Sequence, residues 1–176
     1  LGASLPVRFA CLCHDLGKGT TPADVLPRHI GHEERSARLL RGLCERWRVP
    51  VECRELADVV AREHGNLHRS AGLGAAAMVR LLERCDAFRK PARFLDIVLA
   101  CECDARGRLG HAGDAYLQRE RLLPALQAAR SVVTADIAAQ AQARGLKGPD
   151  VGALIHRARV TEVAKALGEG ALDRTP

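Results

Sequence analysis

The spacing of apolar residues is the feature that most constrains the fold of this chain. Apolar side chains recur three and four positions apart, for example at Phe94, Ile97 and Cys101, and no stretch shows the strict alternation of a half-buried strand. Hydrophobic residues make up 47% of the 176 positions but aromatic residues only 3%, so Leu, Val and Ala must supply most of the core. We therefore predict an all-α protein of one domain or one and a half.

Glycine and proline residues divide this pattern into separate helices. The predicted helices cover residues 6–16, 32–48, 51–64, 75–88, 91–104, 115–144 and 150–167. We expect Gly17 to end the first helix and Pro124 to kink or split the long segment 115–144. The glycine-containing stretch 65–74 is predicted to be a loop.

Charge and cysteine content narrow the class of protein. The net charge of +6 favours an anionic partner such as RNA or a phosphate ester, although surplus Arg is also typical of solvated helix faces. The seven cysteines are an odd number inside apolar stripes, which predicts buried, reduced thiols in a cytoplasmic protein. No apolar run is long enough to cross a membrane. Because the chain begins at Leu1 and a helix follows within a few residues, we interpret it as a piece of a longer protein.

Three predicted core-facing stripes end in residues that can bind a metal: His14, His64 and Asp104. A buried carboxylate must be paired, hydrogen-bonded or metal-bound, and imidazoles and carboxylates from separate helices build metal sites in helical bundles. Other interpretations remain open. A lone core His is more often hydrogen-bonded than a ligand, Asp104 could pair with Arg106 or Arg108, and His64 could mark a helix end.

The doublet His14-Asp15, in the stretch CLCHDLGKG, is harder to explain structurally. Neighbours on a helix project about 100° apart. At a helix end, where the backbone can adjust, both side chains could still reach one metal ion. The doublet therefore strengthens the prediction of a metal site.

CHDLGKG resembles the signature of the HD superfamily of metal-dependent phosphohydrolases. A fuller resemblance, covering essentially the whole chain, is to bacterial multifunctional CCA-adding tRNA nucleotidyltransferases. It is carried by FACLCHDLGKGTTP, LPRHIGHEERSARLL, REHGNLH, LLERCDAFRKP, CECDARGR and GLKGPDVGALIHRARV, in this order. The resemblance implies an HD-domain helical bundle over residues 1–109, N-terminally truncated so that its first helix is missing, and a C-terminal helical tail over 110–176. Nothing in the chain resembles the nucleotide-adding head of such enzymes.

The resemblance also implies a ligand set. His14, Asp15 and Asp104 would hold a divalent cation together with an upstream His that this chain lacks, so weakened binding is expected. His32 and His64 would line the pocket or hold a second metal. Imidazole and carboxylate ligands suit Ni, Co, Mn, Mg or Zn.

Phosphoester hydrolysis needs positive charge at the phosphoryl oxygens, and Lys18 and Arg106 are the candidates in this sequence. The alternative for Lys18 is a solvated loop cation, but the flanking glycines let backbone and side chain approach a phosphate closely, which favours the functional role. Asp15 could also act as a base toward water. The resemblance implies 2′-nucleotidase, 2′,3′-cyclic phosphodiesterase and phosphatase activity, for example on damaged tRNA ends. His29 and His68 are expected to be surface polar residues.

Two further features give alternatives. Cys11 with Cys13, and Cys101 with Cys103, look like zinc ligand pairs, but residues two apart on a helix project about 200° apart, so we interpret Cys11 and Cys101 as core residues.

The tail is basic with few aromatics, which suits contact with a phosphate backbone rather than base stacking. Its cations are Arg119, Arg121, Arg130, Arg144, Lys147, Arg157 and Arg159. The alternatives to the resemblance are a stand-alone HD nucleotide phosphohydrolase and a non-catalytic RNA-binding helical module. The oligomeric state stays open.

Overall fold

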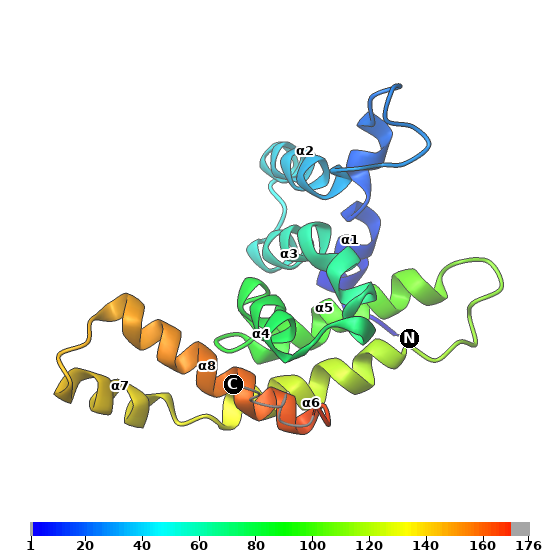
Figure 1. Cartoon of the computed structure of the whole chain (residues 1–176). Coiled ribbons are helices and arrows are strands. Elements are labelled where there is room, and N and C mark those ends of the chain that lie inside the picture. Colours follow the sequence, from blue (N-terminus) through cyan, green and yellow to red (C-terminus); the bar gives the residue numbers. More distant parts are fainter. Residues whose placement is uncertain (1, 170–176) are drawn as a thin grey trace. The chain divides into compact units, whose positions relative to one another are not determined.

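The computed structural model, which describes residues 2–169, is built from α-helices and short 3-10 turns, with no strand in that range (Figure 1). This confirms the all-α prediction. The helices are α1 Leu5–Cys13, α2 His32–Trp47, α3 Val51–His68, α4 Ala75–Arg84, α5 Pro91–Arg106, α6 Leu117–Ser131, α7 Thr134–Ala143 and α8 Gly148–Ala166, with 3-10 turns η1 Leu16–Thr20 and η2 Ser70–Gly72. Among the described helices, none combines the length and apolar character needed to cross a membrane.

The helices form two compact units. The first unit comprises Leu1–His68 and Lys90–Tyr116, and α3 packs in it against α1, α2 and α5. Its core contains Val7, Leu56 and Phe94, whose side chains are fully buried. This unit holds every residue of the predicted metal site, so its helix packing decides which of them meet.

The second unit comprises Arg69–Arg89 and Leu117–Pro176. In it α8 packs against α4, α6 and α7, and the guanidinium of Arg159 lies 3.8 Å above the centre of the Phe88 ring. The unit therefore includes α4, which lies within the range 1–109 expected for the HD domain, as well as the C-terminal tail.

The predicted end of α3 is wrong by one turn. The helix continues through Gly65 to His68 instead of ending at His64. A glycine inside a helix costs about 1 kcal/mol relative to alanine. Leu67, one turn later, is fully buried, and burying a leucine side chain contributes about 1.5–3 kcal/mol. Packing therefore outweighs the local preference, and His68 becomes part of the helix.

The predicted split of the segment 115–144 is confirmed, but its position is not at Pro124. Pro124 lies inside α6, and the break falls between α6 and α7, at residues 132–133. Leu122, Ala125 and Leu126 are buried around the proline, so α6 keeps its apolar contacts although one backbone donor is missing.

The first helix also ends earlier than predicted, and Gly17 has a different role. α1 stops at Cys13, His14 caps it, and η1 follows. Gly17 is buried in η1 against α2, where its N–H donates to Ser36 Oγ at 2.8 Å and its carbonyl accepts from Arg35 Nε at 3.1 Å. A Cβ at this position would lie only 2.5 Å from Ser36 N and 2.8 Å from Arg35 Cβ. Glycine is required here because the two backbones touch.

Candidate metal centre

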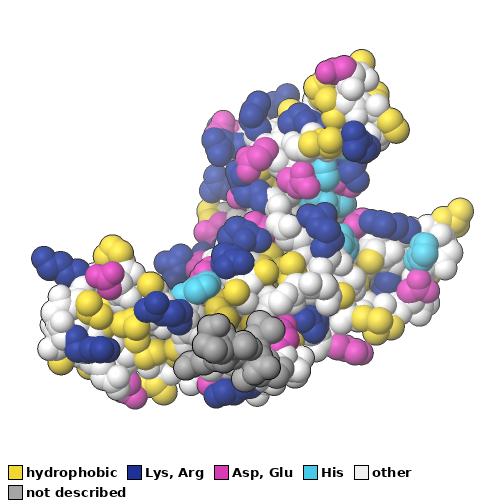
Figure 2. Space-filling model, viewed as in Figure 1, with side chains coloured by type: hydrophobic (Ala, Val, Ile, Leu, Met, Phe, Trp, Pro, Cys, Tyr) yellow, Lys and Arg dark blue, Asp and Glu magenta, His cyan; other side chains and the backbone are white. Residues whose placement is uncertain are grey.

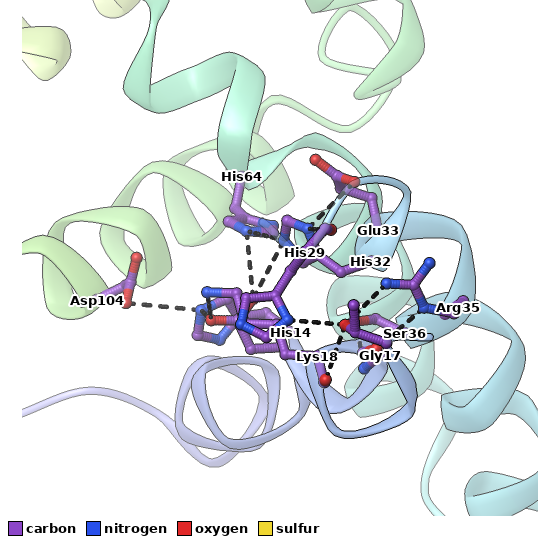
Figure 3. A network of polar contacts seen from close by, with 12 residues as sticks. His14, Gly17, Lys18, His29, His32, Glu33, Arg35, Ser36, His64 and Asp104 are labelled. Carbon is purple, nitrogen blue, oxygen red and sulfur yellow. Dashed lines mark hydrogen bonds and ion pairs between the residues drawn. The ribbon is translucent and has the colours of Figure 1, made fainter. Parts of the chain in front are cut away.

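The His14-Asp15 doublet lies where α1 ends and η1 begins. The N–H of His14 donates to Ala10 O at 3.0 Å, which completes the helix, and Asp15 is the first residue outside it. Lys18, one turn later, lies with its Nζ 2.6 Å from Asp15 Oδ2 (Figure 3). The tight turn therefore places an imidazole, a carboxylate and an ammonium group together.

Three histidines from three elements share one hydrogen-bond arrangement. In each, Nδ1 faces a backbone carbonyl of the preceding turn: His14 with Cys11 O at 2.8 Å, His32 with His29 O at 2.9 Å, and His64 with Val60 O at 3.0 Å. A carbonyl only accepts, so Nδ1 carries the proton in each ring. Nε2 is therefore the nitrogen of each ring that faces the cluster, and in a neutral imidazole it carries the lone pair that binds metals.

These three Nε2 atoms converge on the carboxylate of Asp15. Figure 3 shows the side chains of His14, His32 and His64 gathered in this region. His14 Nε2 lies 3.2 Å from Oδ2, while His32 Nε2 and His64 Nε2 lie 3.3 and 3.6 Å from Oδ1. The two Nε2 atoms of His32 and His64 are 3.3 Å apart. His14 Nε2 and Asp15 Oδ1 are buried and, despite these short distances, have no hydrogen-bond partner with acceptable geometry. Lone pairs that face an anionic oxygen repel one another unless a cation or a proton lies between them.

Asp104 reaches the same cluster from α5. Its Oδ1 lies 3.5 Å from His14 Nε2, on the side of that ring which also faces Asp15. Among the described residues, His14, Asp15 and His64 have ligand atoms that all lie within 4.8 Å of one another. The donor chemistry, mixed imidazole and carboxylate, fits a divalent cation.

Electrostatics agree with a site built for positive charge. Burial disfavours the charged form of His14, but the carboxylates of Asp104 and Asp15 outweigh it and raise the pKa of His14 to about 10. Burial alone would raise the pKa of Asp15, yet His14 and Lys18 hold that pKa well below its usual range. The neighbouring imidazoles of His14 and His68 do the same to the pKa of Asp104. Without metal, a proton on His14 supplies the charge that the cluster requires.

The comparison with protein families agrees with this geometry. The family model described as HD domain matches residues 1–106, more than half of the chain.

The chain belongs to the HD domain family.

HD domains are metal-dependent phosphohydrolases. Among similar curated proteins is the multifunctional CCA protein of Polaromonas naphthalenivorans, with 70% identity over 94% of this chain and 39% of the relative. The multifunctional CCA protein of Paracidovorax citrulli is 77% identical over 90% of this chain and 38% of the relative. The chain thus spans about two fifths of the length of these relatives, which supports the resemblance expected from the motifs. No solved structure matches the chain significantly.

Arg106 does not join the HD cluster. Its Nε and NH2 donate to Ala112 O at 3.1 and 2.9 Å, and its NH1 bonds to Glu102 Oε1 at 3.0 Å. These contacts hold the turn after α5, so we remove Arg106 from the candidate catalytic residues. The guanidinium beside Asp104 is instead that of Arg108, whose NH2 lies 3.5 Å from Asp104 Oδ2. Arg108 lies just beyond the end of α5, and pairing of Asp104 with either Arg106 or Arg108 was the expectation from the sequence.

Two histidines expected to be surface residues have specific partners. His29 bonds through Nδ1 to Thr21 Oγ1 at 2.7 Å, and its carbonyl accepts from His32. His68 Nε2 lies 2.9 Å from Asp104 Oδ2, with about a fifth of its side chain exposed. The spacing of His64 and His68, one turn apart, could have indicated that both face the site.

The cysteines do not form a competing site. All seven are free thiols, and within the described part of the chain the metal-capable group contains none of them. Burial raises the pKa of the Cys11 and Cys13 thiols to about 11. Cys101 is fully buried on the apolar face of α5. The interpretation as a core residue is confirmed for Cys101, whereas Cys11 is only half-buried and its thiol lies 3.5 Å from Ala100 O.

Proposed function

We propose that His14, Asp15 and Asp104 hold a divalent cation with which this HD domain hydrolyses phosphoesters. The observation that carries the proposal is the convergence of three Nε2 atoms on the Asp15 carboxylate, with buried atoms of His14 and Asp15 left without hydrogen bonds. A cluster of this kind is unfavourable unless a cation balances it. Ni, Co, Mn and Mg are the candidate ions.

His32 and His64 are not among the three proposed ligands of the cation. Both lie near Asp15 Oδ1, whereas His14 lies near Oδ2, so the carboxylate separates two groups of nitrogen donors. The pair either lines the substrate pocket or holds a second ion. Burial lowers the pKa of His64, which keeps its imidazole neutral and able to act as a ligand.

The cation would polarise a phosphoryl oxygen and lower the pKa of bound water. Asp15 stays ionised because its pKa is held so low, which favours a ligand role over a general-base role. Lys18 is the candidate for contact with a phosphate oxygen, since its side chain is 41% exposed while its Nζ reaches Asp15. In the upper part of Figure 2, histidine side chains reach the surface with side chains of Lys or Arg and of Asp or Glu beside them.

We propose nucleotide phosphoesters as the substrates, namely 2′-nucleotides and 2′,3′-cyclic phosphates, and tRNA as the macromolecular partner in the cytoplasm. The names of the relatives and the net charge of +6 support this. The second unit offers exposed cations for a phosphate backbone at Arg119, Arg130, Arg144, Lys147 and Arg157. Arg121 and Arg159 do not belong to this set, because Arg121 donates to Leu73 O and Arg159 covers the Phe88 ring.

The test is phosphate release from adenosine 2′-phosphate and 2′,3′-cyclic AMP by the whole chain, with each of the four metals. We expect metal-dependent turnover that chelation abolishes and that His14→Ala and Asp15→Asn reduce at least about a hundredfold. His111→Ala is the matched control, because His111 pairs with Asp114 on the surface outside the cluster. Turnover that survives both site variants would contradict the proposal. Salt-sensitive tRNA binding without any turnover would favour the RNA-binding module instead.

A further inference from the structure

We infer that His68 is a positioning residue that holds the Asp104 carboxylate toward the metal site, and that Tyr116 orients His68 for this role. The inference rests on the proposed function, because it requires a cation beside Asp104. It concerns two residues outside the ligand set proposed above.

The two oxygens of Asp104 have different neighbours. Oδ2 lies 2.9 Å from His68 Nε2 and 3.5 Å from Arg108 NH2, so both outer donors meet the same oxygen. Oδ1 lies 3.5 Å from His14 Nε2 and faces the cluster. His68 therefore occupies the oxygen that points away from the site and leaves the other one for a cation. Without this bond the carboxylate could rotate about its terminal torsion, which has a broad profile.

The hydrogen bonds of a neutral His68 ring have a defined direction. An ionised carboxylate only accepts, so Nε2 of His68 carries a proton and donates it to Asp104. In the neutral ring Nδ1 is then an acceptor, and the Tyr116 hydroxyl, 3.2 Å away, is its donor. Hydrogen bonds in such a chain polarise one another, so the Tyr116 bond strengthens the donor at Nε2.

Packing restricts the His68 ring in addition to its hydrogen bonds. The Tyr116 ring stands perpendicular to it with centroids 5.9 Å apart, and the His64 ring meets it edge-on at 6.1 Å. Tyr116 is 8% exposed, so its ring is largely buried while its hydroxyl contacts His68. The last turn of α3 thus supplies both a cluster histidine and the histidine that orients Asp104.

This arrangement predicts that substitution of His68 or Tyr116 lowers the affinity for a divalent metal. Groups that orient a metal ligand typically contribute about 10- to 100-fold to metal affinity. Isothermal titration of Mn²⁺ or Co²⁺ into the whole chain should show that loss for His68→Leu. His68→Gln should stay within about threefold of the unchanged chain, because its amide nitrogen can donate to Asp104 from near the position of Nε2. Tyr116→Phe removes one hydroxyl and should weaken binding by about three- to tenfold.

A double-mutant cycle separates positioning from general packing. If His68 acts through Asp104, His68→Leu should add no more than about twofold to the loss caused by Asp104→Asn. A full additional loss in the Asp104→Asn background would overturn the inference. The visible spectrum of bound Co²⁺, which reports coordination geometry, should change in His68→Leu but not in the matched control His111→Leu.

The outcomes separate this inference from the proposed function. Failure of the unchanged chain to bind any of the metals would refute the proposed metal site itself. Normal binding by the unchanged chain together with equal affinity in His68→Leu would overturn the role of His68 alone. If His68→Leu does not fold by circular dichroism, Tyr116→Phe decides, and unchanged affinity in that variant overturns the inference.

Discussion

Replacement of Gly17 by alanine tests how the HD doublet is held in place. The added methyl would lie 2.5 Å from Ser36 N, 2.8 Å from Arg35 Cβ and closer still to His32 O. Two of these three neighbours are backbone atoms of α2, which cannot rotate away. Either η1 must lift from α2 or the first turn of α2 must shift. In both cases Asp15 and His32, whose Oδ1 and Nε2 are 3.3 Å apart, are displaced relative to each other.

The magnitude follows from three contributions. Overpacking a close contact costs about 1–3 kcal/mol. Lifting η1 also weakens the bonds from Gly17 N–H to Ser36 Oγ and from Arg35 Nε to Gly17 O, each with a net value of about 1 kcal/mol. The reduced entropy of the unfolded chain offsets about 0.4–1 kcal/mol. We therefore expect Gly17→Ala to lower the free energy of unfolding by about 2–4 kcal/mol.

Urea unfolding followed by circular dichroism measures this change, and calorimetric titration of Mn²⁺ measures the effect on the site. Gly19→Ala is the matched control, because it lies in the same 3-10 turn and an added Cβ meets nothing within 4 Å. We expect this control to change stability by less than about 0.5 kcal/mol and to leave metal affinity unchanged. Equal stability of the Gly17 and Gly19 variants would refute the argument that close backbone contact positions the doublet.

Three other expectations follow from the structure. A divalent metal at about 100 times its Kd should raise the free energy of unfolding by about 2.7 kcal/mol, measured by urea unfolding with and without chelator; no shift would contradict the metal site. Iodoacetamide at pH 8 should label Cys11 and Cys13 only after denaturation, because a pKa of about 11 leaves about one thiol in a thousand ionised; mass spectrometry of native labelling checks this. Leu67→Ala should lower the free energy of unfolding by about 2–5 kcal/mol, whereas a loss below about 1 kcal/mol would mean that burial of Leu67 does not extend α3.

Parts of the candidate site could be predicted because they depend on local pattern. Helical spacing placed His14, His64 and Asp104 at the ends of buried stripes, and the structure brings all three to one cluster. The adjacency of His14 and Asp15 is covalent, so it holds in any fold. The all-α class followed from the same periodicity, which reports only which face of each helix is buried.

The remaining parts required the tertiary structure, because they depend on contacts between distant segments. The sequence indicates Gly17 only as a helix stop. The reason that it cannot carry a side chain is the close contact with α2, which begins fifteen residues later. Arg106 and Arg108 are equivalent candidates by spacing, and only the course of the turn after α5 directs Arg106 to Ala112 and leaves Arg108 beside Asp104.

The sequence by itself determined the helical class of this protein, its HD doublet and the stripes that carry its polar side chains inward. The tertiary structure alone decided how far α3 runs and therefore that His68 reaches Asp104. The physical reason is that intrinsic helix preferences differ by about 1 kcal/mol or less for most residues, whereas burial of one large side chain contributes more than that. Long-range packing consequently decides where α3 ends, and His68 lies at that end.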